Sequence, residues 1–79
     1  MVIITADIIL AASLRCKGCP LIKIDIAGAG SRGLFSIDAS QELLDSYDLG
    51  QLLVEPAKFN TEIKNLTTAV RRKNGYNSF

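Results

Sequence analysis

The sequence predicts a small single domain of the α+β class, and three observations predict it. The chain has 79 residues, 48% apolar and 22% charged, which suffices for one hydrophobic core and is too apolar for a disordered chain. Residues 21–26 alternate between apolar and polar side chains, as a half-buried strand does. Residues 59–70 repeat apolar side chains at helical spacing. We expect one domain over residues 1–73 and a frayed polar tail over residues 74–79.

The first expected element is a helix over residues 5–17. Thr5 is a suitable N-cap, and Asp7 lies in the first turn, where the helix dipole favours a negative charge. Gly18 follows at the usual C′ position, and Pro20 blocks continuation of the helix.

A β-hairpin is expected next. The three isoleucines of residues 21–26 share one face of a strand, and two charged residues lie on the other face. A glycine-rich loop follows, and residues 34–37 are its hairpin partner, with Phe35 and Ile37 on a common face.

A short second helix is expected over residues 39–49. Asp38 offers a cap, and Gln41 three residues later completes an approximate capping box. The helix stops at Gly50, and residues 52–54 are expected to form a short edge strand.

The last helix begins at Pro56, which suits the first helical position. Its apolar stripe has spacings of four, three and four residues: Phe59, Ile63, Leu66 and Val70. The expected order is therefore α-β-β-α-(β)-α, an antiparallel hairpin-centred sheet covered by helices.

The charge balance excludes several function classes. Nine basic and eight acidic residues give a net charge of +1, so no overall field draws the chain to nucleic acid or to an anionic membrane. The chain has no histidine, the commonest general base and metal ligand. Its apolar start lacks a basic n-region and is interrupted by Asp7, which argues against a targeting segment or a membrane partner. With two cysteines three positions apart, no disulfide framework is expected, and we expect a cytoplasmic protein.

Cys16 and Cys19 form a C-x-x-C motif. Redox motifs of this type sit at a helix N-terminus, whereas this pair falls at the end of a helix, where the dipole opposes thiolate formation. A structural zinc site needs four ligands, and the chain offers no further cysteine or histidine. We expect small residues that pack a helix end, with a zinc site shared between two subunits as the alternative.

Residues 28–33 match the dinucleotide-binding pattern G-x-G-x-x-G. In that fold a helix follows the glycines and receives the pyrophosphate, whereas residues 34–37 here predict a strand. We therefore expect a hairpin loop with Arg32 exposed, and no cofactor.

A basic run, Arg71, Arg72 and Lys73, ends the last helix, and Lys64 lies upstream. Three cations at a helix C-terminus complement its dipole. The same four residues could instead contact the phosphates of a nucleic acid.

The residues of one wider pattern lie at packing and capping positions. They are Thr5, Ala6, Asp7, Leu10, Ala12 and Gly18 around the first helix, Phe35 in the second strand, and Leu53, Val54, Glu55, Pro56, Phe59 and Leu66 at the last helix. In this pattern residues 5–73 resemble a family of small uncharacterised proteins of bacteria and their mobile elements, a domain of unknown function. Most related sequences carry Asp where this chain has Glu55. The resemblance implies a fold and neither a substrate nor a cofactor.

We expect a small interaction or adaptor protein without enzymatic activity. The apolar surplus, with a mean hydropathy of +0.23, suggests a subunit contact, so a second copy of the chain and an unidentified protein are the expected partners. Nucleic-acid binding through the basic helix end is the alternative, and the zinc-bridged dimer is a second one.

Overall fold

The computed structural model describes residues 1–27 and 32–75. Part of the glycine-rich loop (residues 28–31) and the end of the expected tail (residues 76–79) therefore lie outside the described residues. The elements in chain order are β1 (Val2–Thr5), α1 (Ile8–Cys16), β2 (Leu21–Ala27), β3 (Arg32–Asp38), α2 (Gln41–Asp48) and α3 (Pro56–Lys73). The α+β class and the antiparallel hairpin with its covering helices are confirmed.

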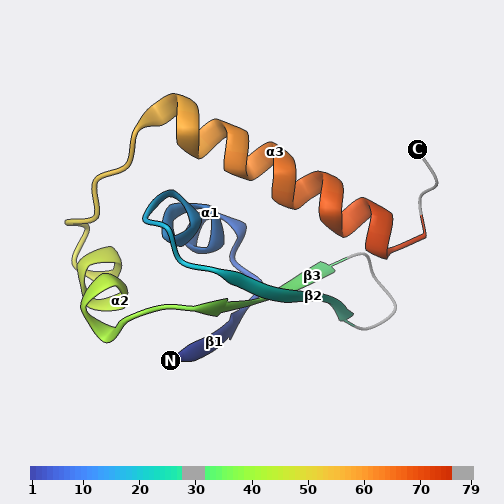
Figure 1. Ribbon diagram of the computed structural model, residues 1–79, viewed down its shortest axis with the longest axis horizontal. Coiled ribbons are helices and arrows are strands. Elements are labelled where there is room, and N and C mark those ends of the chain that lie inside the picture. The colour runs from blue at the N-terminus through green and yellow to red at the C-terminus, as the bar shows by residue number, and fades with distance from the viewer. Residues whose placement is uncertain (28–31, 76–79) are drawn as a thin grey trace.

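The three strands form one antiparallel sheet in the order β1-β3-β2. Helices α1 and α3 lie on one face of it, and α2 lies beyond the end of β3 (Figure 1). Helix α1 packs against β1 and β3, and α3 packs against α1 and β2. No described helix covers the opposite face, where Val2 and Ile4 are 58% and 66% exposed.

The core lies between the helices and the covered face of the sheet. Phe35 and Ile37 are 2% and 0% exposed, which confirms the predicted common face of β3. The predicted stripe of α3 is also confirmed: Leu66 is buried, and its other three members pack against the core cluster. The remaining buried apolar residues are Ala11, Ala12, Leu14, Cys19 and Ala39.

The third strand is β1, not residues 52–54 as predicted. All four residues of β1 are β-branched, which favours a strand, and Val2 pairs with Asp38 while Thr5 pairs with Phe35. Residues 52–54 form no strand and pair with none of the three strands, and Leu53 is 80% exposed.

Helix α1 consequently begins later than predicted. Asp7 is its N-cap, and its carboxylate accepts hydrogen bonds from the backbone N–H groups of Ile9 (3.0 Å) and Leu10 (3.3 Å). Thr5, the predicted cap, ends β1, and its hydroxyl accepts a hydrogen bond from the N–H of Asp7 at 3.0 Å.

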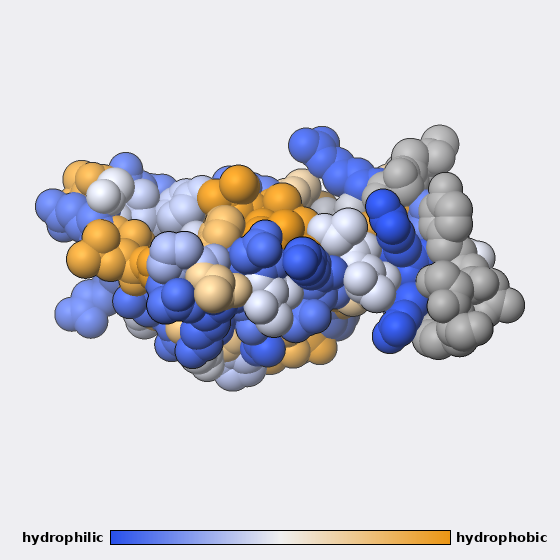
Figure 2. Space-filling view, turned by 90° about the horizontal axis from the view of Figure 1, so that it is seen from above, coloured by the Kyte–Doolittle hydropathy of each residue, from blue (hydrophilic) through white to orange (hydrophobic). Residues whose placement is uncertain are grey.

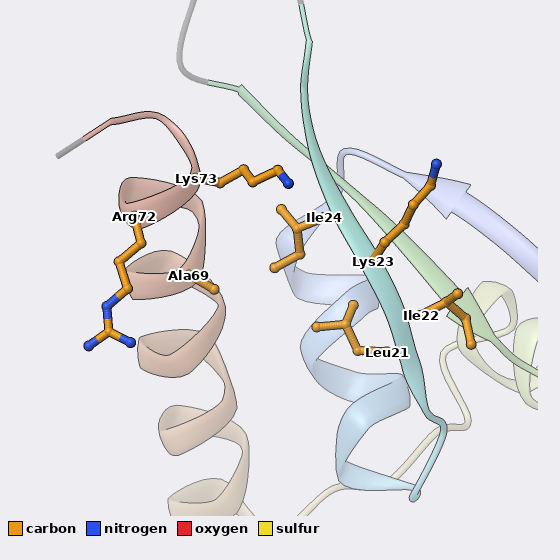
Figure 3. Close-up of a pocket in the computed structure, with 7 residues that line it drawn as sticks. All are labelled: Leu21, Ile22, Lys23, Ile24, Ala69, Arg72 and Lys73. Atoms are coloured by element: carbon orange, nitrogen blue, oxygen red, sulfur yellow. The ribbon is translucent and has the colours of Figure 1, made fainter. Parts of the chain in front are cut away.

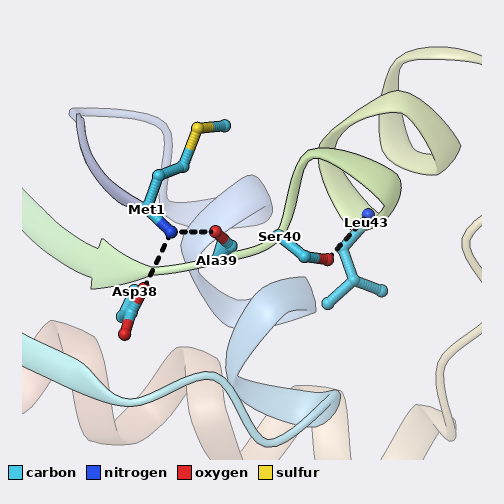
Figure 4. A network of polar contacts seen from close by, with 5 residues as sticks. All are labelled: Met1, Asp38, Ala39, Ser40 and Leu43. Carbon is cyan, nitrogen blue, oxygen red and sulfur yellow. Dashed lines mark hydrogen bonds and ion pairs between the residues drawn. The ribbon is translucent and has the colours of Figure 1, made fainter.

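Helix α2 is capped by Ser40 rather than by Asp38. The Ser40 hydroxyl accepts a hydrogen bond from the N–H of Leu43 at 3.2 Å (Figure 4). Asp38 remains in β3, where its carboxylate lies 3.0 Å from the amine of Met1 (Figure 4). Asp38 is part of the strand rather than a cap because it pairs with Val2 of β1, a strand that the sequence did not predict.

Strand β2 contains a bulge that the alternating pattern did not predict. Leu21 pairs with Ile37 and Lys23 with Ser36, so Ile22 is the extra residue. Leu21 therefore replaces Ile22 on the covered face, and Ile22 is 54% exposed.

The start of α3 and the end of α2 lie where the sequence predicts them. Pro56 opens α3, and Gly50 adopts the left-handed conformation after α2 with φ of +71°. The carboxylate of Glu55 caps α3 by accepting from the N–H groups of Ala57 (3.1 Å) and Lys58 (2.7 Å). Asn74, placed in the frayed tail by the sequence, is the C-cap of α3.

Candidate functional site

A groove runs between the edge strand β2 and the last turns of α3 (Figure 3). Four residues of β2 and three of α3 line it: Leu21, Ile22, Lys23, Ile24, Ala69, Arg72 and Lys73. It exists because α3 crosses the covered face beside β2, while no described strand pairs with the outer edge of β2.

The floor of the groove is apolar. Leu21 and Ile24 are half-buried and pack against the core cluster, and Ala69 on α3 presents only a methyl group. Ile22, the extra residue of the β2 bulge, also lines the groove but points to the side of the strand away from α3, and it is more than half exposed (Figure 3). The floor therefore offers a few apolar side chains that a bound segment would bury.

The rim of the groove is basic. Lys73 reaches across toward β2, whereas Arg72 extends away from the strand (Figure 3). Lys23 lies on the far side of β2, where its ammonium is 3.3 Å from the carboxylate of Asp25. Lys73 is therefore the cation directed toward β2, and no carboxylate is among the described residues that line the groove, so its charge favours an acidic partner.

Some backbone N–H and C=O groups of β2 point outward along the free edge of this strand, beside the groove. The N–H of Asp38 donates to the carbonyl of Pro20 at 3.0 Å, so Asp38 and alternate residues of β3 point their backbone groups toward β2. Beyond the bulge, Asp25 is one of the β2 residues whose backbone groups pair with these β3 residues. Ile24 and Ile26 alternate with Asp25 along β2, so their N–H and C=O groups are directed away from the sheet. Such groups can pair with an added extended chain.

The four cations predicted to bind nucleic acid do not share one face. Lys64 and Arg71 are two helical turns apart on the side of α3 opposite its buried stripe, and Arg72 lies beside them. Lys73 lies instead over β2 (Figure 3). The structure therefore keeps Lys64 and Arg71 together on the outward side, places Arg72 beside them at the edge of the groove, and directs Lys73 toward β2.

Cys19 is a structural residue of a helix end. Gly18, with φ of +85°, donates its N–H to the Arg15 carbonyl (3.0 Å), and Cys19 donates to the Leu14 carbonyl (3.1 Å). These two bonds form a Schellman motif, in which the residue after glycine packs against the helix. Cys19 is 6% exposed and joins Leu14 in the core.

Both thiols are poor candidates for nucleophiles or metal ligands. Burial, followed by the charge of Glu62, raises the pKa of the Cys16 thiol, and burial followed by the charge of Asp38 raises the pKa of Cys19. No group of three or more potential metal ligands occurs in residues 1–27 and 32–75. A zinc ion shared between subunits would require Cys19 to leave the core.

Gly33, the last glycine of the G-x-G-x-x-G pattern, has a packing role. It is buried under α3, where an added Cβ would lie 2.5 Å from Cγ2 of Val70. It belongs to β3, so a strand takes the place of the helix that a dinucleotide site needs. Arg32 is exposed, as predicted, and the rest of the pattern falls on residues 28–31, outside the described part.

Sequence reasoning missed the groove and the strand β1. The helical spacing does place Ala69 and Lys73 on one side of α3, but nothing local indicates that β2 lies opposite them. For β1 a signal existed, because four consecutive β-branched residues favour a strand.

The face seen in Figure 2 carries hydrophilic residues along its length, with hydrophobic groups between them. Seen from above, hydrophilic residues gather where α3 ends, and hydrophobic ones surface over the connection between α2 and α3 (Figure 2). In that connection Leu49 and Leu53 are 70% and 80% exposed. None of the helices in the described residues is both long and apolar enough to span a bilayer.

Comparison of the chain with protein-family models, with curated proteins and with solved structures finds no match in any of the three.

Proposed function

We propose that this chain is a protein-interaction domain that binds an extended, acidic segment of a partner protein in the groove between β2 and α3. The observation that carries the proposal is the coincidence, in one groove, of an open strand edge, an apolar floor and the ammonium group of Lys73 directed toward β2. Extended segments bind such edges through main-chain hydrogen bonds, and their side chains provide specificity.

The proposed role is not enzymatic, and the proposed compartment is the cytoplasm. The chain lacks histidine, and the raised pKa of both thiols disfavours their nucleophilic forms at neutral pH. Both cysteines are free thiols, a state typical of proteins in a reducing compartment.

A labelled peptide tests the proposal. The probe is a fluorescent peptide of about seven residues that alternates glutamate and valine, and binding is measured by anisotropy. We expect the peptide to bind and the affinity to fall with added salt, because the rim of the groove is basic. Lys73→Glu should weaken binding about ten-fold, equivalent to ~1.4 kcal/mol.

The matched control is Lys64→Glu, which makes the same charge change on the same helix but away from the groove. It should alter the affinity less than about two-fold, because surface charges a Debye length away are screened. Equal losses in both variants would show non-specific attraction. An alternating lysine and valine peptide that bound as well as the acidic one would also refute the proposal.

Nucleic-acid binding is a second candidate, favoured by the outward side of α3. Lys64, Arg71 and Arg72 lie there, while Glu62 turns inward to Arg15 at 3.4 Å. Three phosphate contacts predict a slope of about −3 in a plot of log affinity against log salt. In a gel shift with a short DNA duplex, the double variant Arg71→Ala with Arg72→Ala should bind more weakly than Lys73→Glu, which lies in the groove.

A further inference from the structure

The two edges of the sheet differ in their protection against strand pairing. The β2 edge carries a bulge at Ile22, a charge at Lys23 and the neighbouring helix α3. Bulges, lysines and covering helices hinder the pairing of two whole edge strands. A short extended segment can still pair with Ile24 and Ile26, which lie beyond the bulge. The β1 edge has none of these protective features: its four residues are uncharged and regular, and Val2 and Ile4 are more than half exposed.

Hydrogen bonds at the start of β1 show which backbone groups face this open edge. Met1 donates to the carbonyl of Ala39 at 2.9 Å (Figure 4), and the N–H of Ala39 donates to the carbonyl of Met1 at 2.8 Å. Hydrogen-bonded pairs alternate in an antiparallel ladder, so Ile3 bonds to Ile37. The N–H and C=O groups of Val2 and Ile4 therefore point away from the sheet, with no strand beside them in the described residues.

We propose that two copies of this chain pair antiparallel through β1 and join their sheets into one six-stranded sheet. Val2 lies opposite the partner's Ile4, and Ile3 lies opposite the partner's Ile3 on the two-fold axis. This register alone uses all the outward backbone groups of Val2 and Ile4 in both copies. It also keeps opposed residues on the same face of the sheet, as antiparallel pairing requires.

The side chains fit the same register. Val2 and Ile4 lie on the uncovered face, so each copy contributes two exposed apolar residues to one continuous stripe across the junction. No charge of one β1 faces a charge of the other. Two strands of four residues bury less than the ~1,200 Å² of a standard interface, so we expect a reversible dimer with a dissociation constant on the order of micromolar.

The dimer also bears on ligand binding. Because β1 and β2 are opposite edges of each sheet, pairing through β1 leaves both β2 grooves open at the far ends of the assembly. A partner with two acidic segments would then bind both grooves, and its avidity would exceed the affinity of either site.

The test is the oligomeric state of three proteins over a range of about 1 µM to about 1 mM, by sedimentation velocity. The parent chain should pass from monomer to dimer. Ile4→Lys should stay monomeric or dimerise at least about ten-fold more weakly, because a lysine protects an edge strand. The matched control Ile22→Lys alters a similarly exposed isoleucine on the other edge strand, and should dimerise like the parent.

Further measurements identify the interface. Ile4 is 66% exposed, so Ile4→Lys should melt with the dilute parent, which confirms an intact fold. In a mixture of isotopically labelled and unlabelled chains, filtered nuclear Overhauser effects should connect the Val2 methyl groups to those of the partner's Ile4. A parent that is monomeric at the highest concentration, or a dimer disrupted by Ile22→Lys and not by Ile4→Lys, would overturn the proposal. Peptide binding by the Ile4→Lys monomer tests the groove separately.

Discussion

Replacing Gly33 by alanine tests the closest approach between the sheet and α3. A Cβ at this position would lie 2.5 Å from Cγ2 of Val70, and 3.4 Å from Cγ1 of Val70 and from Cζ of Phe35. Valine holds essentially one rotamer in a helix, and Val70 packs against the core, so its methyl group has no alternative position nearby. The substitution must therefore displace either the side chain or the helix.

The sign of the effect distinguishes this contact from ordinary strand behaviour. Gly33 is not among the described glycines with positive φ, so alanine can adopt its backbone conformation. Without a clash, alanine would stabilise the fold by roughly 0.4–1 kcal/mol, because the unfolded chain loses freedom. With the clash, overpacking lowers the free energy of unfolding by about 1–3 kcal/mol.

A double-mutant cycle with Val70→Ala measures the contact directly. Removing the two methyl groups of Val70 costs about 1–2 kcal/mol on its own, by the usual effect of a small cavity. Urea unfolding of the parent, both single variants and the double variant gives the four free energies. We expect the double variant to be at least ~1 kcal/mol more stable than the sum of the single losses predicts, because Val70→Ala removes the clashing atom.

Two results would refute this reasoning. One is a Gly33→Ala protein at least as stable as the parent. The other is additivity within about 0.5 kcal/mol, which would mean that the two positions do not interact.

Two further predictions concern pH and helix capping. The pKa values of the Cys16, Cys19 and Tyr47 side chains are all raised, chiefly by burial, so the folded state holds these protons more tightly than the unfolded state does. The contribution of the two thiols to stability is complete below the ordinary cysteine pKa of about 8.5, and that of Tyr47 below the ordinary tyrosine pKa of about 10; each is lost as the pH rises above that value. Urea midpoints should therefore fall in alkaline buffer, and less so in Cys16→Ser, whereas an equal fall in both proteins would exclude Cys16. Glu55→Ala removes two hydrogen bonds from the start of α3 and should lower the free energy of unfolding by about 1 kcal/mol, which lowers the melting temperature by roughly 4–8 °C. The control Glu55→Asp keeps the cap and should melt near the parent. An equal loss of melting temperature in both variants would contradict the capping role.

The C-x-x-C and G-x-G-x-x-G patterns show how a motif can arise from packing. Cys19 follows the glycine that ends α1 and fills the core beside Leu14, and Gly33 allows Val70 to approach β3. Cys19 in the first pattern and Gly33 in the second therefore each make a close packing contact in the fold. The cysteine pair lies at the end of a helix rather than at its start, and the glycines lead into a strand rather than a helix. The sequence already indicates both positions, and they agree with these packing roles.

Only part of the candidate site could be predicted from the sequence. The basic end of α3 is evident from Arg71, Arg72 and Lys73, yet the orientation of Lys73 toward β2 is not. The groove depends on the separation between a helix and a strand more than forty residues apart in the chain, and on a bulge that exposes Ile22. Alternation alone predicted Ile22 to face the core, because a period of two assumes that no residue is inserted.

The sequence by itself determined α3, the β2–β3 hairpin and the C-terminal ends of α1 and α2, because these depend on neighbours within a few residues. The apolar stripe that includes Leu66, the proline at the start of α3 and the glycine at the end of α2 are signals of this kind. Only the tertiary structure decided that β1 is the third strand and that the sheet has two unlike edges. Pairing of Val2 with Asp38 joins residues far apart in the chain, and a local pattern contains no information about which strand will lie beside β3.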